Sequence, residues 1–374
     1  MAMWIIIIWT VIAFAITALF YLGAKVADLF TFEGIAEWTK FRQFSLGLLI
    51  VLGFSGIIML CIDFVNAIVC VMYVAMIWAV SDFSFWAIEK IFHISFEQYW
   101  VGLAALAVSI FALGVGWYLD HKVWQTNYEL VTDKNVPNLR VAMFADAHLG
   151  TTFDAERFAK HLEVIETQEP DIVVVVGDYV DDNTKKEDMV KASKALGKMK
   201  TKYGVYFVFG NHDKGYYGAA HRGFSAAELV NELSKSGVEV LRDENVLIND
   251  AFYIIGRRDY SVEREHSGKR KSMAELVKDV DKSKYMIVLN HQPTEFDKQA
   301  DAEVDLVLSG HTHGGQMFPF NQVGKWIGAN DLVYGHEKRK NTDFIVTSGI
   351  SDWAIKFKTG TKSEFVIIDI KKDK

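Results

Sequence analysis

Residues 171–182 have the sequence DIVVVVGDYVDD, in which an apolar run of five residues leads straight into a polar cluster. Such a run of Ile and Val is typical of a strand that is buried on both faces. The arrangement recurs where LRVAMFA (139–145), GVYFVF (204–209), YMIVL (285–289) and VDLVLS (304–309) precede DAHLG, GNHD, NHQP and GHTHGGQ. Helical patterns separate several of these strands, at 154–168, 186–200 and 225–236. Strands that alternate with helices predict an α/β fold.

Side chains that could bind metal follow each of these strands directly. They are Asp146, His148, Asp178, Asn211, His212, Asp213, His291, His311 and His313. In α/β folds ligands bind at the carboxyl ends of strands, so we expect the five clusters at one sheet edge. Carboxylate, imidazole and amide groups without thiolate suit Mn, Fe or Zn, and the set is too rich in nitrogen for Ca or Mg. The candidates outnumber the needs of one ion, which predicts a dinuclear site with ions roughly 3.5–4 Å apart.

Each motif by itself also occurs in loops that bind nothing. Gly-Asp is an ordinary turn, and a histidine two residues before a proline, as in NHQP, is more often an exposed side chain. Only the joint occurrence of the motifs, each after a strand, favours a metal site. In an extended segment, residues i and i+2 point to the same side, so His311 and His313 are expected to serve one ion each. Gly310, Gly314 and Gly315 are expected to let the backbone turn sharply there.

The first 120 residues have a different composition, with four Lys or Arg residues, eight Asp or Glu residues and both cysteines, Cys61 and Cys70. Their apolar runs predict four membrane spans, with three as the alternative. The first span lacks a basic n-region and exceeds a signal peptide's apolar stretch, so we expect it to be retained. Asp63 is expected at a turn, because a carboxylate in mid-membrane costs a few kcal/mol. The aromatic stretch 83–100 is expected at the membrane interface. The predicted spans are 4–24, 44–62, 64–80 and 99–119.

The rest of the chain is predicted to form a polar linker at 121–138 and a soluble domain at 139–374. Together they hold 36 basic and 39 acidic groups, so nucleic acid is not an expected partner. With four spans, the N-terminus and this domain share one side of the membrane. The positive-inside rule places the loops with Lys25, Lys40, Arg42 and Lys90 in the cytoplasm. We therefore expect a multi-pass protein of the cell membrane with an extracytoplasmic domain, a side that three spans would reverse.

The ordered motifs Asp-x-His, Gly-Asp-x-x-Asp, Gly-Asn-His-Asp, His and Gly-His-x-His resemble those of the calcineurin-like metallophosphoesterase superfamily. The resemblance covers residues 139 to about 370. The strings GDYVDD, GNHDKGYYG and SGHTHGGQMFP look most like bacterial membrane-associated phosphoesterases. That branch includes enzymes that act on phosphodiesters and on UDP-diacylglucosamine-type pyrophosphates. The resemblance implies a four-layer αββα sandwich with a dinuclear centre, preceded here by the transmembrane helical region.

The resemblance also implies roles for individual residues. His212 matches the histidine beside the leaving group, and Asp181 matches the acid that orients this histidine. Asp213 is expected to cap the local turn, with support of His212 as the alternative. The implied ligands are Asp146, His148 and His313 for one metal, Asn211, His291 and His311 for the other, and Asp178 as the bridging carboxylate.

Two stretches bear on the substrate side of the predicted site. Where the family often has SxGxG followed by proline, this chain has TSGISDWAIKFKTG (347–360), so the rim there is expected to differ. The charged insertion GRRDYSVEREHSGKRK (256–271) contains Arg257 and Arg258, which could clamp a phosphate. A solvated loop and a contact with anionic lipid headgroups are the alternatives for this insertion.

These features predict a membrane-anchored phosphoesterase that hydrolyses a phosphodiester or pyrophosphate bond. The anchor alone suggests a lipid-linked substrate. Two metals would convert a bridging water to hydroxide and hold the phosphoryl oxygens, while His212 protonates the leaving group or stabilises its charge. One alternative is a non-enzymatic membrane sensor or scaffold that keeps the fold. The complete ligand set argues against it, because a scaffold has no need for metal ligands. The other is a transporter with an accessory domain, which the scarcity of polar residues in the spans disfavours.

Overall fold

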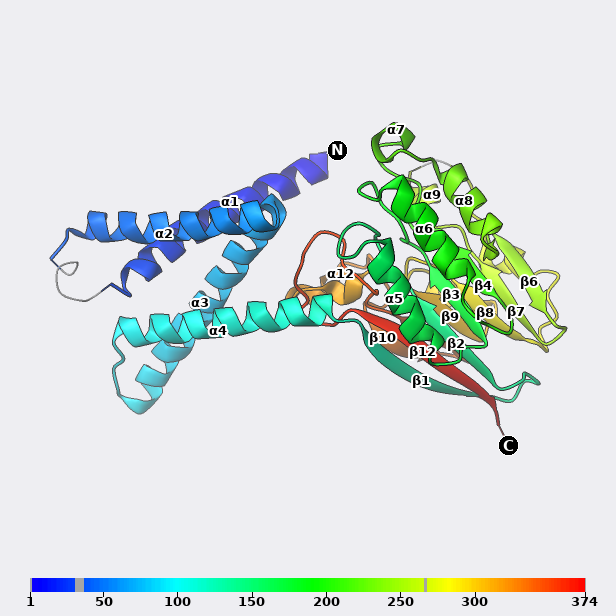
Figure 1. Cartoon of the computed structure of the whole chain (residues 1–374). Helices are drawn as coiled ribbons and strands as arrows, with labels where there is room; N and C mark the ends of the chain where they lie inside the picture. The colour runs from blue at the N-terminus through cyan, green and yellow to red at the C-terminus, as the bar shows by residue number, and fades with distance from the viewer. Residues whose placement is uncertain (1, 31–36, 266–267, 374) are drawn as a thin grey trace. The chain divides into compact units, whose positions relative to one another are not determined.

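The computed structural model describes residues 2–30, 37–265 and 268–373 of the chain (Figure 1). By its internal contacts the chain divides into two compact units, Met1–Trp117 and Tyr118–Lys374. Long helices make up the first unit, whereas the second contains both β-sheets. The second unit carries all of the predicted metal ligands.

Long helices occupy the N-terminal region, as predicted. Among the described residues, four helices are long and apolar enough to cross a membrane. Side chains such as Leu22, Val51 and Trp78 form a small apolar core between them. The helices are α1 (Ala2–Ala27), α2 (Lys40–Cys61), α3 (Phe64–Phe92) and α4 (Gln98–His121).

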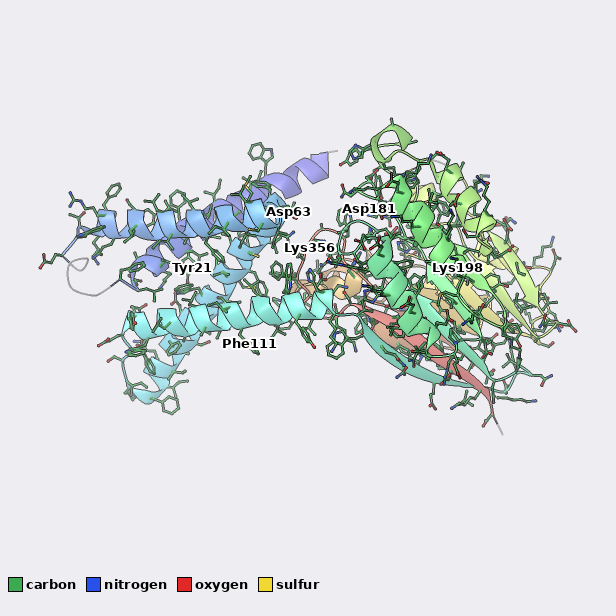
Figure 2. The ribbon with its side chains drawn as sticks, viewed as in Figure 1. Tyr21, Asp63, Phe111, Asp181, Lys198 and Lys356 are labelled. Carbon is green, nitrogen blue, oxygen red and sulfur yellow. The ribbon has the colours of Figure 1, made fainter. Side chains whose placement is uncertain are left out.

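The turn predicted at Asp63 separates α2 from α3 (Figure 2). The Asp63 carboxylate caps α3 by accepting hydrogen bonds from the backbone N and the side-chain Nδ2 of Asn66, at 2.7 and 2.8 Å. Helix α3 then continues to Phe92, because no helix-breaking residue occurs before His93, which ends the helix with a φ of 55°. The first half of the stretch 83–100 therefore extends α3, and its location at the membrane interface stays a prediction.

Two six-stranded mixed sheets form the second unit. The first sheet contains one antiparallel pairing among parallel ones, whereas the second has a parallel block with an antiparallel strand at each edge. The first sheet has the order β1 (Trp124–Thr132), β12 (Glu364–Lys372), β2 (Leu139–Phe144), β3 (Ile172–Val176), β4 (Val205–Val208), β5 (Val238–Val240). The second has the order β10 (Gly335–Arg339), β11 (Thr342–Val346), β9 (Leu306–Ser309), β8 (Tyr285–Leu289), β7 (Phe252–Gly256), β6 (Glu244–Ile248).

Three apolar cores hold this unit together in four layers, which confirms the predicted αββα sandwich. The central core joins the two sheets, with Val174 of β3 and Ile287 of β8 in the same cluster. A second core packs α5 (Ala155–Glu166), α6 (Lys186–Gly197) and α8 (Ala226–Lys235) on the first sheet. A third packs α10 (Met273–Leu276) and α11 (Phe296–Asp301) on the second sheet. Short helices complete the unit: α7 (Ala219–Arg222), α9 (Ser261–Arg264), η1 (His313–Gly315), η2 (Phe320–Gln322) and α12 (Val323–Trp326).

The predicted linker at 121–138 is wrong for half of its length, because residues 124–132 form strand β1. This strand pairs in parallel with β12, from Trp124 opposite Glu364 to Thr132 opposite Lys372. Exposed and partly buried positions alternate along it, as expected for an edge strand with one face in solvent. That half-exposed pattern gives the segment the polar composition that suggested a linker.

The strands that precede the predicted ligand clusters all exist: β2, β3, β4, β8 and β9. Because β2, β3 and β4 run parallel in one sheet and β8 and β9 in the other, their carboxyl ends lie together. Contacts between the sheets fix this edge. The Nδ1 atom of His291 lies 2.7 Å from the carbonyl oxygen of Val176, and the backbone N of His311 donates to the Asp146 carboxylate at 3.0 Å.

Candidate metal centre

Two groups of buried side chains meet where these strands end; we call this region the metal edge. Within each group the potential ligand atoms lie within 4.8 Å of one another. Carboxylate and imidazole ligands together suit divalent ions such as Mn, Zn or Fe, so each group could hold one ion. The first group is Asp146, His148 and His313, and the second is Asp178, His291 and His311.

Asp178 lies between the two groups. Its Oδ2 atom is 3.1 Å from Nε2 of His291 and 3.7 Å from Nε2 of His148. Its other oxygen, Oδ1, accepts a hydrogen bond from the backbone N of His212 at 2.8 Å. One carboxylate oxygen thus faces imidazoles of both groups, which is the geometry that a bridging ligand requires.

Asn211 is a further predicted ligand, and it follows strand β4. Its Nδ2 atom donates to the hydroxyl of Tyr216 at 3.0 Å, which fixes the orientation of the amide. Among the residues that the structure describes, buried Oδ1 of Asn211 and buried Nδ1 of His311 have no hydrogen-bond partner. A buried polar atom without a partner costs free energy, and a bound cation would remove that cost. These two atoms therefore fit a metal site.

Two histidines are held in the tautomer that binds metal through Nε2. Nδ1 of His291 lies 2.7 Å from the carbonyl oxygen of Val176, and Nδ1 of His313 lies 3.2 Å from that of Ser351. A carbonyl oxygen only accepts hydrogen bonds, so each Nδ1 carries a proton and Nε2 is the nitrogen that remains for a metal ion. Such backbone contacts are the usual way in which proteins orient metal-binding imidazoles.

The backbone is strained at five of the seven predicted ligands. Their φ values are 56° for Asp146, 38° for His148, 51° for Asp178, 72° for His311 and 48° for His313. Residues with a side chain rarely adopt these conformations, and such strain tends to collect at functional sites. The expected extended spacing of His311 and His313 is therefore wrong. Both lie in a tight turn, and the turn sends one imidazole to each group.

Glycines allow the close approach of the loops at two points. A Cβ atom on Gly177 would lie 2.4 Å from Nδ1 of His291. A Cβ atom on Gly310 would lie 2.6 Å from Oδ2 of Asp146. Any side chain at either position would displace a predicted ligand.

Asp213 organises the loop after β3, as the predicted turn cap. Its carboxylate accepts hydrogen bonds from four backbone N atoms, at 2.7–3.0 Å. Burial raises the pKa of Asp213 to about 7, an effect that neighbouring Asp178 reinforces. Asp213 thus shapes the backbone from which Asp178 projects, and its oxygens face amides rather than the ligand groups. The four donors are Asp178, Tyr179, Val180 and Gly210.

The electrostatics of the metal edge favour cation binding at several ligands. Burial would raise the pKa of Asp178, but His291 and other nearby imidazoles hold it well below its usual value. Burial lowers the pKa of His311 to about 4. An ionised carboxylate and a neutral imidazole are the forms that bind metal ions. At His291 the carboxylate of Asp178 outweighs burial and raises the pKa, so a metal ion would compete with a proton there.

His212 lies beside the two groups and is only partly buried. Its ring centroid is 5.0 Å from that of His148, 5.1 Å from Tyr216 and 5.0 Å from Trp353. Burial lowers the pKa of His212, although Asp178 opposes the effect. A lowered pKa makes the protonated imidazole a stronger acid, which suits His212 to proton transfer.

Asp181 has a different neighbour from the predicted one. Its Oδ2 atom lies 3.5 Å from Nδ1 of His148 and accepts a hydrogen bond from Thr151 Oγ1 at 3.2 Å. Among the described residues it has no hydrogen bond to His212. Asp181 thus orients a predicted metal ligand, because the chain turns back toward β2 after Asp178.

The structure also corrects the predicted phosphate clamp. Arg257 is 2% exposed, and its guanidinium pairs with Glu295 at 3.1 Å, so no face is open to a substrate. Arg258 is exposed, and its backbone N donates to Asp243 at 2.9 Å, so its contact with a phosphate stays a prediction. Residues 266 and 267 of the insertion lie outside the described residues.

Sequence reasoning missed the contribution of Lys358, in the loop between β11 and β12. Lys358 is fully buried, and its Nζ donates to the carbonyl oxygens of Ser348 and Ser351 at 2.9 Å each. The Ser351 carbonyl is also the acceptor for Nδ1 of His313. In the same loop, Lys356 donates to the carbonyl oxygen of Thr151 at 3.0 Å. The departure of 347–360 from the family pattern was the one available signal.

Comparison with known proteins agrees with this site. A family model described as calcineurin-like phosphoesterase matches residues 139–315, which include every predicted ligand. The chain is 35% identical over 193 residues to an uncharacterized metallophosphoesterase of Aquifex aeolicus, covering 51% of this chain and 70% of that protein. The chain therefore belongs to the calcineurin-like metallophosphoesterase family, as its motifs predicted.

Two further relatives are more distant in sequence. One is an uncharacterized metallophosphoesterase of Campylobacter jejuni, 30% identical over 245 residues, with 64% of this chain and 62% of that protein aligned. The other is the bovine "transmembrane protein with metallophosphoesterase domain", 28% identical over 240 residues, with 61% of this chain and 52% of that protein aligned. The chain thus spans less than two thirds of both proteins. Among solved structures, a Thermus thermophilus protein matches with a TM-score of 0.37 and 11% identity, over 58% of this chain and 90% of that one.

Proposed function

We propose that this chain is a membrane-anchored phosphoesterase that works with two divalent metal ions, Mn, Zn or Fe. The observation that carries the proposal is the pair of adjoining buried ligand groups with Asp178 between them. The site lies within the region that matches the family model. Oδ1 of Asn211 and Nδ1 of His311 are two further atoms that could bind a metal ion, because neither has a hydrogen-bond partner among the described residues.

Bound ions would lower the pKa of a water molecule so that hydroxide forms near neutral pH. They would also offset the negative charge of the phosphoryl oxygens. Residues of the chain would position the metal ligands and protonate the leaving group. Asp178 sets the separation of the two groups, and the carbonyls of Val176 and Ser351 keep His291 and His313 in their metal-binding tautomers. In its protonated form, which the lowered pKa makes a stronger acid, His212 would donate a proton to the leaving oxygen and become neutral; such a role contributes about 100- to 10,000-fold in comparable enzymes.

The proposed substrate is a phosphodiester or a pyrophosphate that is linked to a lipid. The anchor supports this choice, because helix α4 ends at His121 and strand β1 begins at Trp124. The proposed location is the cell membrane, with four spans. The basic residues Lys25, Lys40, Arg42 and Lys90 between the spans favour an extracytoplasmic site.

The direct test uses the purified full chain in detergent with bis-p-nitrophenyl phosphate. We expect hydrolysis that a chelator abolishes and that added Mn²⁺ or Zn²⁺ restores. A protein that binds metal and hydrolyses neither this diester nor a pyrophosphate would instead be the non-enzymatic sensor or scaffold. Comparison of diesters, monoesters, nucleotide-sugar lipids and phospholipids would then define the substrate class.

A further inference from the structure

An exposed apolar segment follows the metal edge directly; we call residues 317–327 the apolar segment. Five large apolar side chains in it face solvent: Phe318 (60% exposed), Phe320 (59%), Val323 (37%), Trp326 (72%) and Ile327 (72%). The segment contains one charged residue, Lys325, which pairs with Glu337 at 3.7 Å. Exposed apolar side chains gathered in so short a stretch indicate an interaction surface.

Hydrogen bonds fasten the start of the apolar segment to the loop that supports the metal edge. The backbone N of Phe318 donates to Thr359 Oγ1 at 3.0 Å, and the backbone N of Thr359 donates to Gln316 O at 2.9 Å. Two residues further on, Thr361 Oγ1 donates to the carbonyl oxygen of His313 at 3.3 Å. A molecule bound to the apolar segment would therefore lie beside the predicted ligands.

The same loop also contacts the end of the last membrane helix, within the unit Tyr118–Lys374. The backbone N of Ser363 donates to Leu119 O at 2.9 Å, and that of Trp124 donates to Ser363 O at 2.8 Å. Five residues, 359–363, span at most about 18 Å when fully extended. The apolar segment thus begins close to the point where the chain leaves the predicted membrane span.

Side chains at that point are those found at membrane–water boundaries. Nζ of Lys122 lies 4.1 Å from the centre of the Trp124 ring and donates to the hydroxyl of Tyr118 at 3.0 Å. Trp, Tyr and Lys are the residues that gather at this boundary. The apolar segment contains Trp, Phe and Ile with a single Lys, a composition that is also typical of segments at the membrane–water boundary.

We propose that the apolar segment inserts into the headgroup–acyl boundary of the bilayer that anchors the chain, and delivers a lipid-linked phosphoester to the metal edge. The occupant of this surface is membrane lipid. The substrate part of the inference rests on the proposed phosphoesterase function, whereas the insertion does not. A second copy of the chain is the competing occupant, and the experiment below separates the two.

The insertion can be measured with the full chain in lipid nanodiscs. Cys61 and Cys70 are first replaced by Ser, and Trp326→Cys then carries an environment-sensitive fluorophore. We expect lipids with brominated acyl chains to quench this probe at least twofold in discs that hold one copy of the chain. The matched control is Val164→Cys on α5, which is 50% exposed and should show no quenching. A probe at 326 without quenching overturns the proposal, and so does a probe that is shielded only in discs with two copies.

Delivery of the substrate is tested with two diesters that share a leaving group. Bis-p-nitrophenyl phosphate is soluble, and hexadecyl p-nitrophenyl phosphate enters the bilayer of the same discs. For the double variant Phe320→Ser, Trp326→Ser we expect about tenfold lower kcat/KM on the hexadecyl diester and a change below twofold on the soluble one. Equal effects on both diesters, or none, overturn the delivery role. If the wild-type chain hydrolyses neither diester, the phosphoesterase proposal fails, and the quenching result still decides the insertion.

Discussion

Two clusters of buried polar side chains in the second unit differ in what their members contact. At the metal edge, imidazoles and carboxylates face one another, and Oδ1 of Asn211 and Nδ1 of His311 lack partners among the described residues. Around Glu295, two buried guanidinium groups and Lys298 share one carboxylate. The first cluster has ligand atoms left over for a cation, whereas in the second both carboxylate oxygens are already paired with cationic side chains. Burial alone therefore does not identify a site, but burial with unused ligand atoms does.

The largest effect should come from Asp178→Asn at the metal edge. Loss of the carboxylate between the two groups should lower both metal content and turnover, the latter on the order of 1,000-fold or more. Metal analysis and kcat/KM on bis-p-nitrophenyl phosphate measure the two effects. Asp250→Asn, in the exposed turn between β6 and β7, is the control and should retain both. An Asp178→Asn protein with full metal content and activity would contradict the role of the metal edge and so the contrast with the cluster around Glu295.

His212→Ala should separate metal binding from catalysis. Because His212 belongs to neither ligand group, the variant should keep its metal and lose about 100- to 10,000-fold in kcat. The measurement is metal content together with kcat on the same diester. His161→Ala on α5 serves as the control for loss of an imidazole. If the His212→Ala protein has lost its metal, its assigned role is incorrect.

Lys358→Met should have a smaller effect, on one ligand group. Without Nζ of Lys358, the Ser351 carbonyl that orients His313 loses its support, so metal affinity should fall about 10- to 100-fold. Titration of the metal-free chain should show one weakened ion and one unchanged ion. Lys362→Met in the same loop is the control. A lower melting temperature with two unchanged affinities would mean that Lys358 supports only the fold.

The cluster around Glu295 should affect stability rather than turnover. Burial opposes ionisation of Glu295, but Lys298, Arg270 and Arg257 together lower its pKa from 4.5 to about 2. A lowered pKa in the folded state stabilises the protein above pH 4.5, and this stability is lost as the pH falls through about 2. The contribution is about 1–3 kcal/mol.

Urea unfolding of the metal-free chain between pH 5 and 2.5 would measure this dependence. The wild type should lose stability over that range more steeply than Glu295→Gln, which lacks the titrating group. Diester hydrolysis at neutral pH should differ less than twofold between the two proteins. Equal pH slopes would mean that the ion pairs of Glu295 contribute nothing measurable.

The layers and the ligands could be predicted from the sequence because the signals for both lie in short, contiguous stretches of the chain. Each strand is an apolar run, and each ligand cluster follows a strand within a few residues, so strand order alone gathers Asp146, Asp178 and His311 at one edge. The partners of Arg257 were not predictable in this way. Its carboxylate, Glu295, is 38 residues away and meets it only through the pairing of β7 with β8.

Two other features depended on contacts that composition conceals. Strand β1 has one face in solvent, so its polar residues suggested a linker until pairing with β12 became visible. Lys358 is fully buried beside Ser348 and Ser351, although a lysine in a loop is ordinarily exposed. In both cases a distant segment of the chain supplies the partner that decides the structure.

The central claim is that the metal edge holds two ions and uses them to hydrolyse a phosphoester. Titration of the metal-free full chain with Mn²⁺, with bound metal and bis-p-nitrophenyl phosphate hydrolysis followed together, tests it most directly. The account predicts activity that rises to a plateau as two ions bind to each chain. Two bound ions without hydrolysis, or hydrolysis that does not depend on metal, would contradict it.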